Sequence, residues 1–409
     1  MTSVTFERAP GSDRLGENRD LRNLFIGGAA AKLGAHISYV ALPLAAVEEL
    51  GASPGEVGLL ASLATAAALV FGLPAGAWID RVRKRRIMVA ADLVRAVLMA
   101  SVPSAWALGA LTMWQLYLVV FLAGVGTVAF DVSQQSLLPS IVDRERLTGA
   151  NARLVALDSG LGVGGRSAAG FLVALLGAPL AVAVDAFGYV CSALFVRRIR
   201  SREAPSGPRA SIAAEVRAGI GFVWRHRALR AMAASGAVNN CSIAMFLAML
   251  PVVWVGADLP AAGLGVLLGA GGAGSFAGAA VARHLRDRLG TGRALWAVGA
   301  AAAPLALSLP LVGPGPGIWV VGLAWALVCA AVGTANVVGV SLRQQATPDE
   351  LLGRMNAVFR FVLMGAVAAG AAVSGLVGEV ASPRTAMWAA AAGMASQWVI
   401  LFAARRSLR

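Results

Sequence analysis

Residues 72–96 read GLPAGAWIDRVRKRRIMVAADLVRA, and this stretch joins two long apolar segments through a short, strongly basic turn. The apolar segment before the turn covers 56–78, and the one after it covers 87–109. About 20 apolar residues are enough for a helix to cross the hydrocarbon core of a bilayer. We therefore expect two antiparallel membrane-spanning helices, with the basic turn held at one membrane surface.

The composition of the whole chain agrees with this expectation. Of its 409 residues, 58% are hydrophobic and only 14% are charged, and the mean hydropathy is +0.73. A soluble domain has about 25% charged residues, so these helices lack the polar faces that water would require. The 48 glycines are typical of helices that pack closely together in lipid.

Twelve apolar segments of this kind follow one another along the chain. We predict membrane helices at 24–47, 56–78, 87–109, 114–137, 150–175, 179–197, 230–255, 262–282, 294–312, 317–340, 355–377 and 385–404. The predicted fold class is an all-α integral membrane protein with twelve transmembrane helices.

The basic residues provide an independent test of this count. All but four of the 35 lysines and arginines lie in the terminal segments or in every second turn; the four are Arg384 in an opposite turn and Lys32, Arg95 and Arg166 inside helices. Positive charge favours the cytoplasmic side, so we expect a multi-pass protein of the cell membrane with both termini in the cytoplasm. The net charge of +14 then indicates contact with anionic lipid rather than with nucleic acid.

The two halves of the chain resemble each other. The pair LR at 21–22 and the pair LP at 42–43 recur at 229–230 and 250–251, at a constant offset of 208 residues. Repeated halves of this kind place a binding site near the membrane midplane, between the halves. The predicted organisation is a cytoplasmic segment 1–23, a six-helix bundle 24–197, a cytoplasmic loop 198–229, a second six-helix bundle 230–404 and a cytoplasmic tail 405–409.

The basic turn follows the pattern G-x-x-x-D-R-x-x-[basic]. Its members are Gly76, Asp80, Arg81, Arg83, Lys84, Arg85 and Arg86. The glycine permits close helix packing, and the aspartate can face the positive amino end of a neighbouring helix. We predict that this turn is a conformational latch, which holds one arrangement of the helices and releases it when they move. The alternative is a basic loop that only sets the orientation in the membrane.

This turn resembles the signature loop of the major facilitator superfamily. The chain as a whole is similar to the drug and siderophore exporter branch of that family, which includes enterobactin exporters and macrolide-efflux proteins. The segments 130–154 and 221–230 carry further resemblance. The resemblance implies two pseudo-symmetric six-helix bundles, alternating access, and proton-coupled export of a small organic molecule such as a drug, a siderophore or a secondary metabolite.

Two positions depart from the family pattern. Arg83 stands where the signature loop usually has a glycine. Arg166 stands in GRSAAG, 165–170, where relatives commonly carry a Gly-Pro pair. That Gly-Pro motif is associated with antiporters. Because Arg166 replaces it, the gating and the cargo that are usual in the family do not carry over to this chain from the resemblance alone.

Ionisable residues at bilayer depth are costly and are commonly functional. Lys32 and His36 lie four residues apart, so they share one helix face. The resemblance places them, with Asp131 and Asp158, on helices that line or flank a central cavity. We predict Asp131, Asp158 and His36 as candidates for proton coupling, because histidine titrates near physiological pH and carboxylates can carry a proton through the membrane.

The remaining polar residues within the spans are candidates for cargo binding or for helix packing. The predicted cavity residues are Lys32, Tyr39, Arg166, Asn239 and Asn240. Among them, Lys32 and Arg166 would attract an anionic cargo. The structural alternative is a static ion pair between Arg166 and Asp185, which lie at similar predicted depth in neighbouring helices.

Other functions fit the sequence less well. An importer, or a lipid or lysolipid transporter of the same fold, is the nearest alternative; a membrane-embedded enzyme or sensor is a remote one. No nucleophile–base motif and no ATP-binding G-x-x-x-x-G-K-[ST] loop is present. Cys191, Cys241 and Cys329 lack metal-ligand spacing. We therefore predict no catalytic residue, no cofactor and no metal, and a monomer whose partners are a small molecule, protons and the lipid bilayer.

Overall fold

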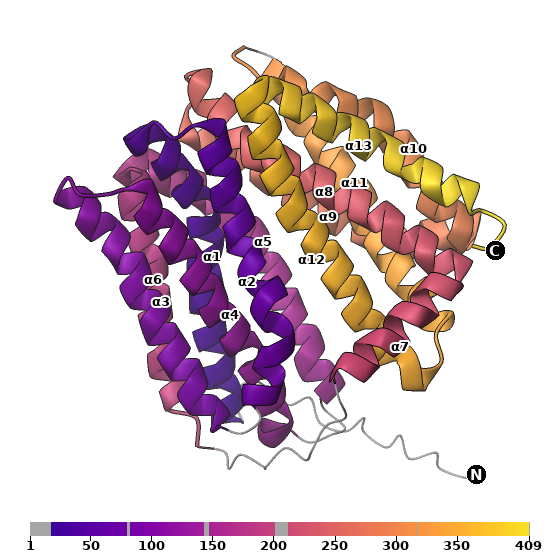
Figure 1. Cartoon of the computed structure of the whole chain (residues 1–409), viewed down its shortest axis with the longest axis horizontal. Coiled ribbons are helices and arrows are strands. Elements are labelled where there is room, and N and C mark those ends of the chain that lie inside the picture. The colour runs from indigo at the N-terminus through magenta and orange to yellow at the C-terminus, as the bar shows by residue number, and fades with distance from the viewer. Residues whose placement is uncertain (1–17, 80–81, 143–146, 201–211, 316, 409) are drawn as a thin grey trace, which may run out of the picture.

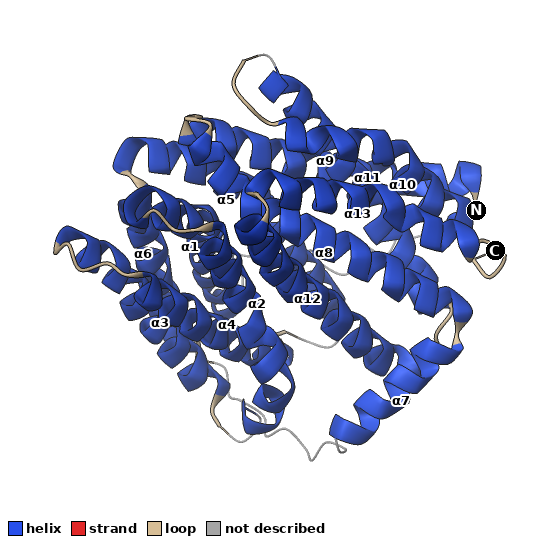
Figure 2. Cartoon of the chain, turned by 45° about the horizontal axis from the view of Figure 1, so that its top comes forward, coloured by secondary structure: helices blue, strands red, loops and turns tan. Residues whose placement is uncertain are grey.

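A computed structural model of the chain describes residues 18–79, 82–142, 147–200, 212–315 and 317–408. Within these ranges the chain forms thirteen α-helices and one short 3₁₀ helix, and no strand (Figure 1; Figure 2). Twelve of the helices are long and apolar enough to cross a membrane. The predicted all-α fold with twelve membrane helices is confirmed.

The membrane helices fall where the apolar segments predict them, although most are longer. The first six are α1 Arg19–Leu50, α2 Pro54–Ile79, α3 Lys84–Ala107, α4 Met113–Ile141, α5 Leu147–Leu176 and α6 Ala178–Arg197. After α7 Ile212–Arg225, the last six are α8 Arg227–Gly256, α9 Ala261–Leu289, α10 Thr291–Ser308, α11 Gly317–Gln345, α12 Asp349–Val380 and α13 Pro383–Ala403, with η2 Leu309–Leu311 after α10. Asn18 extends α1 beyond its apolar part, because its side chain accepts hydrogen bonds from the first backbone N–H groups.

The helices form two bundles that are related along the chain. Helices α1–α6 pack with one another, as do α8–α13, and the two groups lie side by side (Figure 1). Helix α1 begins at Arg19 and α8 begins at Arg227, so the 208-residue offset of the sequence repeat is also the offset of these two helices. The bundles meet mainly through α2 against α12 and α5 against α9.

Glycines make the closest contacts between the bundles. A β-carbon at Gly58 of α2 would lie 2.7 Å from the backbone nitrogen of Gly375 in α12. A β-carbon at Gly170 of α5 would lie 2.6 Å from the backbone nitrogen of Gly265 in α9. All four glycines lie toward the end of the molecule opposite the basic turns, and we call this the distal end. The bundles are therefore closed against each other at the distal end.

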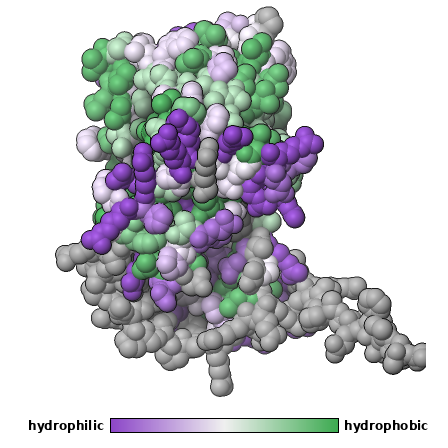
Figure 3. Space-filling model, turned by 90° about the vertical axis from the view of Figure 1, so that its right-hand side faces the viewer, coloured by the Kyte–Doolittle hydropathy of each residue, from purple (hydrophilic) through white to green (hydrophobic). Residues whose placement is uncertain are grey.

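The outer surface is that of a protein embedded in lipid. Large apolar side chains are widely exposed on the helices, among them Val97, Phe187, Phe276, Trp319 and Leu376. On the face shown in Figure 3, hydrophobic and neutral residues cover the upper part, and hydrophilic residues gather in a band below them. Exposed arginines at the basic ends of α8, α9, α10 and α13 include Arg227, Arg230, Arg288, Arg293 and Arg405. This distribution is typical of a membrane protein, in which apolar side chains face the lipid and basic side chains lie at the membrane surface.

The predicted central loop 198–229 is in part helical, which corrects the sequence interpretation. Residues 212–225 form α7, which packs against α12 and α8. Gly219 lies against α12, where a β-carbon would come within 3.0 Å of the Val358 side chain. Val223 is buried, while Trp224 on the next position is exposed. A short amphipathic helix is stabilised by its packing partner, and apolar length alone does not reveal it.

Candidate functional site

Three ionisable side chains meet between α1 and α5. The Lys32 ammonium forms an ion pair with Asp158, with 2.7 Å between Nζ and Oδ1. His36 Nε2 lies 3.8 Å from the same carboxylate oxygen. The Asp158 side chain is 47% exposed and that of Lys32 30%, so water or a small ligand can reach the pair. We call Lys32, His36 and Asp158 the charged triad.

Close packing of α1 on α5 holds the charged triad together. Two glycines of α5 face His36, and a β-carbon at Gly165 would lie 2.8 Å from the histidine Cβ. Asp158 lies one to two helical turns before these glycines. The glycine-rich stretch of α5 therefore allows the histidine to approach the helix that carries its carboxylate neighbour. The sequence predicted these three residues separately, and the structure brings them together.

Arg166 lies against an aromatic ring of α1. Its guanidinium carbon lies 4.9 Å from the centre of the Tyr39 ring, which is within cation–π range. The predicted ion pair between Arg166 and Asp185 is wrong, because no such contact within 4.0 Å occurs among the described residues. Asp185 packs instead on Gly34 of α1. Arg166 and Asp185 lie at similar depth in neighbouring helices, but their side chains do not point toward each other.

The predicted latch is described only in part. Asp80 and Arg81 lie outside the described residues, and Gly76 lies in the last turns of α2. Of the basic run, Arg83 and Arg86 are exposed and Lys84 is buried at the start of α3. The Arg85 guanidinium donates a hydrogen bond to the backbone carbonyl of Ile199 at the end of α6. This contact ties the turn to its own bundle.

An apolar cavity of about 130 Å³ lies between the two bundles, and we call it the central chamber. Helices α1, α2 and α4 line it from one bundle, and α8, α9 and α12 from the other. The prolines of the two repeated LP pairs, Pro43 and Pro251, both face it. Among the described lining residues, only Ser38, Tyr39 and Thr65 contribute side-chain hydroxyl groups. A partly open apolar space with a few polar groups is typical of a small-molecule site.

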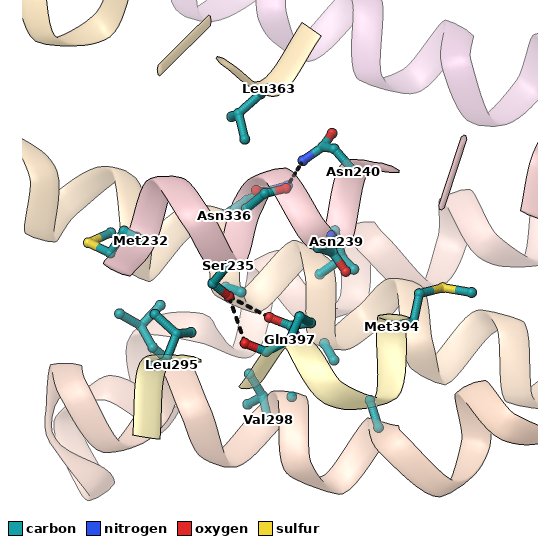
Figure 4. A pocket seen from close by; sticks show the side chains of 18 of the residues that line it. Met232, Ser235, Asn239, Asn240, Leu295, Val298, Asn336, Leu363, Met394 and Gln397 are labelled. Carbon is teal, nitrogen blue, oxygen red and sulfur yellow. Dashed lines mark hydrogen bonds between the residues drawn. The ribbon is translucent and has the colours of Figure 1, made fainter. Parts of the chain in front are cut away.

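A second cavity, of about 120 Å³, lies inside the C-terminal bundle and is rich in carboxamides (Figure 4). Asn239 and Asn240 of α8, Asn336 of α11 and Gln397 of α13 line it. The Ser235 hydroxyl forms a hydrogen bond of 2.7 Å with the Gln397 side-chain oxygen. The Asn240 amide donates to a backbone carbonyl one turn earlier in α8, at 2.9 Å. We call this space the amide cavity; Arg343 also lines it, with its guanidinium carbon 4.3 Å from the centre of the Phe359 ring, so the cavity combines carboxamides with one positive charge.

Asp131 of α4 has no ion pair within 4.0 Å among the described residues. Its nearest charged groups include Lys32, Arg95, Arg360 and Asp158. It therefore lies in the electrostatic field of the charged triad without being part of it. The structure describes no group of three or more metal-ligating side chains.

A buried ion pair in α3 escaped the sequence analysis. Arg95 and Asp92 are fully enclosed in the N-terminal bundle, where a guanidinium N–H donates to the carboxylate. The sequence did carry a signal for this pair. Two ionisable residues three positions apart, in the first half of the apolar span 87–109, lie on one helix face.

The family assignment follows from a match along most of the chain. Residues 24–363 match the sequence model of the Major Facilitator Superfamily. The chain belongs to the major facilitator superfamily. Members of this superfamily are transporters, so the resemblance of the signature loop and the twelve-helix fold are confirmed together.

Known relatives within the superfamily include drug exporters. The multidrug efflux pump Tap of Mycolicibacterium fortuitum is 28% identical over 220 residues, which cover 51% of this chain and 53% of Tap. The chain thus matches about half the length of the curated relatives. A bacterial homologue of the iron transporter ferroportin has the same fold, with 17% identity and coverage of 95% and 98%. Its inward-facing structure gives a TM-score of 0.76, against 0.61 for its outward-facing structure at 18% identity and coverage of 94% and 98%.

Proposed function

We propose that this protein is a secondary active exporter of a small organic molecule, and that the cargo passes between the two bundles by alternating access. The central chamber carries this proposal, because both bundles line it and it adjoins the closed contacts at the distal end. Gly58 of that contact lies between Val57 and Leu60 of α2, and both of these line the chamber. A site that both bundles share is what alternating access requires.

The lining of the chamber indicates the class of cargo. Its walls are almost entirely aliphatic, so the cargo body that fits them is apolar. Tyr39 joins the chamber to Arg166, whose guanidinium offers a positive group at one edge. The charge of Lys32, in contrast, is already compensated by Asp158. We therefore propose an apolar molecule with a polar or anionic group, and we place that group at Arg166.

The charge distribution and the distal contacts support an orientation in the membrane and a conformational state for this proposal. We propose that both termini and the basic turns face the cytoplasm, as the positive-inside rule predicts. The distal end then faces outward, and its glycine contacts close the passage on that side. The better superposition on the inward-facing ferroportin homologue supports the same assignment. The structure then corresponds to the state that would receive cargo from the cytoplasm.

The charged triad is our candidate for proton coupling. A proton bound by Asp158 would neutralise its charge and release Lys32, which now joins α5 to α1 at 2.7 Å. His36 lies close enough to the same oxygen to share that proton. Breaking the pair would loosen α1 from α5, and these helices carry Tyr39 and Arg166 at the edge of the chamber. Asp131 is the second candidate, because it lies in the field of the same charges.

Neutralising the candidate carboxylates tests this coupling. In inverted membrane vesicles, we expect Asp158→Asn with Asp131→Asn to abolish uptake of a fluorescent hydrophobic dye driven by a pH gradient. Uptake down a dye gradient should persist, because the chamber is unchanged. Asp258→Asn is the matched control, since Asp258 lies exposed in a distal turn. Unchanged pH-driven uptake in the double variant would reject the coupling assignment.

Replacing Arg166 tests the proposed position of the anionic group. We expect Arg166→Leu to reduce transport of an anionic dye about tenfold or more, which corresponds to about 1.4 kcal/mol, while a neutral dye of similar shape is transported as before. The level of folded protein should stay near wild type, because Arg166 has no ion pair to lose among the described residues. An equal effect on both dyes would mean that Arg166 only supports the packing of Tyr39.

The apolar chamber also favours one alternative function. An acyl chain would fit aliphatic walls as well as an organic drug does, so a lysolipid transporter of the same fold remains the second candidate. Fluorescent lysolipid and hydrophobic dye, offered to the same reconstituted vesicles, separate the two. Transport of lysolipid alone would replace the exporter proposal.

A further inference from the structure

A group of polar side chains lies buried inside the N-terminal bundle, on the side of α1 that faces away from the charged triad. Lys32 and His36 of α1 face α5, whereas Gly34 and Ser38 of the same helix face α6. The side chain at the centre of the buried group is Asp185 of α6, which is 0% exposed. Apart from Ser38, which also lines the central chamber, this group has no role in the function proposed above.

Among the described residues, this group contains one cation, and it pairs with a carboxylate other than Asp185. Arg95 of α3 donates to Asp92 and, at 3.2 Å, to the Thr127 hydroxyl. Its guanidinium also lies over the ring of Tyr189, 4.2 Å from the ring centre. Within the described part of the chain, this group therefore contains two carboxylates and one arginine, and the arginine pairs with Asp92. Asp185 has no salt bridge within 4.0 Å among the described residues.

The surroundings of Asp185 provide little stabilisation for a negative charge. Both carboxylate oxygens are buried and have no hydrogen bond of standard geometry among the described residues. On the α1 side, a β-carbon at Gly34 would come within 2.6 Å of Oδ1, so the carboxyl group packs directly on the helix backbone. Ser38 of α1 and Tyr189 of α6 lie beside it. From α3, the charged neighbours are Arg95 and, beyond Tyr189, Asp92.

We propose that Asp185 is a proton-binding site inside the N-terminal bundle, and that its carboxyl group holds a proton while α1 packs on α6 as it does here. An isolated buried carboxylate is so costly that it neutralises instead. A protonated carboxyl group is uncharged and can donate a hydrogen bond to the neighbouring Ser38 hydroxyl. The tight contact at Gly34 can therefore form only with the neutral acid. Losing the proton would separate α1 from α6.

Infrared spectroscopy of the full-length protein in lipid nanodiscs tests this proposal directly. We expect wild-type protein at neutral pH to show the C=O stretching band of a protonated carboxyl group. Asp185→Asn should remove that band, whereas Asp131→Asn and the exposed control Asp258→Asn should retain it. A wild-type spectrum without the band, or loss of the band only in Asp131→Asn, would overturn the proposal.

Stability measurements keep the proposal testable if a variant folds poorly. Asn has the shape of the neutral acid, so Asp185→Asn should unfold at about the wild-type temperature. The folded state keeps a proton that the unfolded chain releases above pH about 4, so wild-type stability should fall as the pH rises from there to the pH at which the folded protein loses this proton, and the variant should lose this dependence. If Asp185→Asn does not accumulate, Asp185→Glu should retain the infrared band at a shifted position. If the infrared band stayed at its wild-type position in Asp185→Glu, the band could not be assigned to residue 185 and the proposal would be contradicted.

Discussion

Gly58→Leu is expected to abolish transport while leaving the folded protein in the membrane. Gly58 of α2 lies against the backbone of Gly375 in α12, at the point where the bundles close the distal end. Forcing extra carbon atoms into such a contact costs about 1–3 kcal/mol, and each 1.4 kcal/mol shifts an equilibrium about tenfold. The bundles then spread at the distal end, and the protein is held in the opposite state.

The same helix provides a matched control. A β-carbon at Gly72 of α2 would meet no atom of the described residues within 4 Å, so Gly72→Leu adds the same side chain without separating the bundles. Transport and the labelling of a cysteine introduced at Leu60, in the chamber wall, should be measured for both variants. We expect labelling from the distal side to increase only in Gly58→Leu. Equal behaviour of the two variants would mean that the distal contact is not a gate.

A cross-bundle hydrogen bond supports this reading of the distal contact. The Glu379 carboxylate of α12 accepts from the backbone N–H of Gly55, at 2.9 Å, at the start of α2. An acidic group is favourable at the amino end of a helix. Because Glu379 is exposed, this bond contributes little to stability. We expect the glycine contact next to it, where the backbones touch, to be the part of the proposed gate that excludes water.

The sequence predicted what depends on composition along the chain, and missed what depends on which side of a helix a residue faces. The twelve membrane spans follow from the length of the apolar segments, and the alternating direction of the spans follows from the placement of the arginines. The fold could therefore be predicted from the sequence. Lys32 was predicted as a cavity residue that would attract an anionic cargo, and in the structure it is paired with Asp158. The pairing of Arg166 with Asp185 failed because depth in the membrane does not determine the direction of a side chain.

The two cavities show the same limit. Asn239 and Asn240 were predicted as cavity residues, and they line the amide cavity inside one bundle rather than the chamber between the bundles. The aliphatic residues that form the chamber carry no signal in sequence, because every membrane helix is rich in them. Two sequence signals do fall there: Tyr39, which was predicted as a cavity residue, and the repeated LP pairs, whose Pro43 and Pro251 both line the chamber. Tertiary packing decides which apolar residues surround a space.

Asp92→Asn is expected to destabilise the protein more than any other substitution considered. It leaves the Arg95 guanidinium buried without its carboxylate, between the rings of Phe130 and Tyr189. Breaking a buried ion pair by removing one partner costs about 3–5 kcal/mol. Arginine cannot release its proton to escape this cost. We expect a marked fall in the unfolding temperature and in the yield of folded protein.

The variant Arg95→Met and the double variant show whether an uncompensated buried charge causes the loss of stability. Arg95→Met leaves Asp92 buried, but a carboxylate can take up a proton and become neutral, so the expected loss is smaller than for Asp92→Asn. Replacing both residues, as in Asp92→Leu with Arg95→Met, removes both charges from the interior and is expected to restore much of the lost stability. Unfolding temperatures measured in one detergent rank the three proteins. If Arg95→Met were the most damaging, the packing of the arginine against the two aromatic rings, rather than its charge, would account for the stability of this bundle.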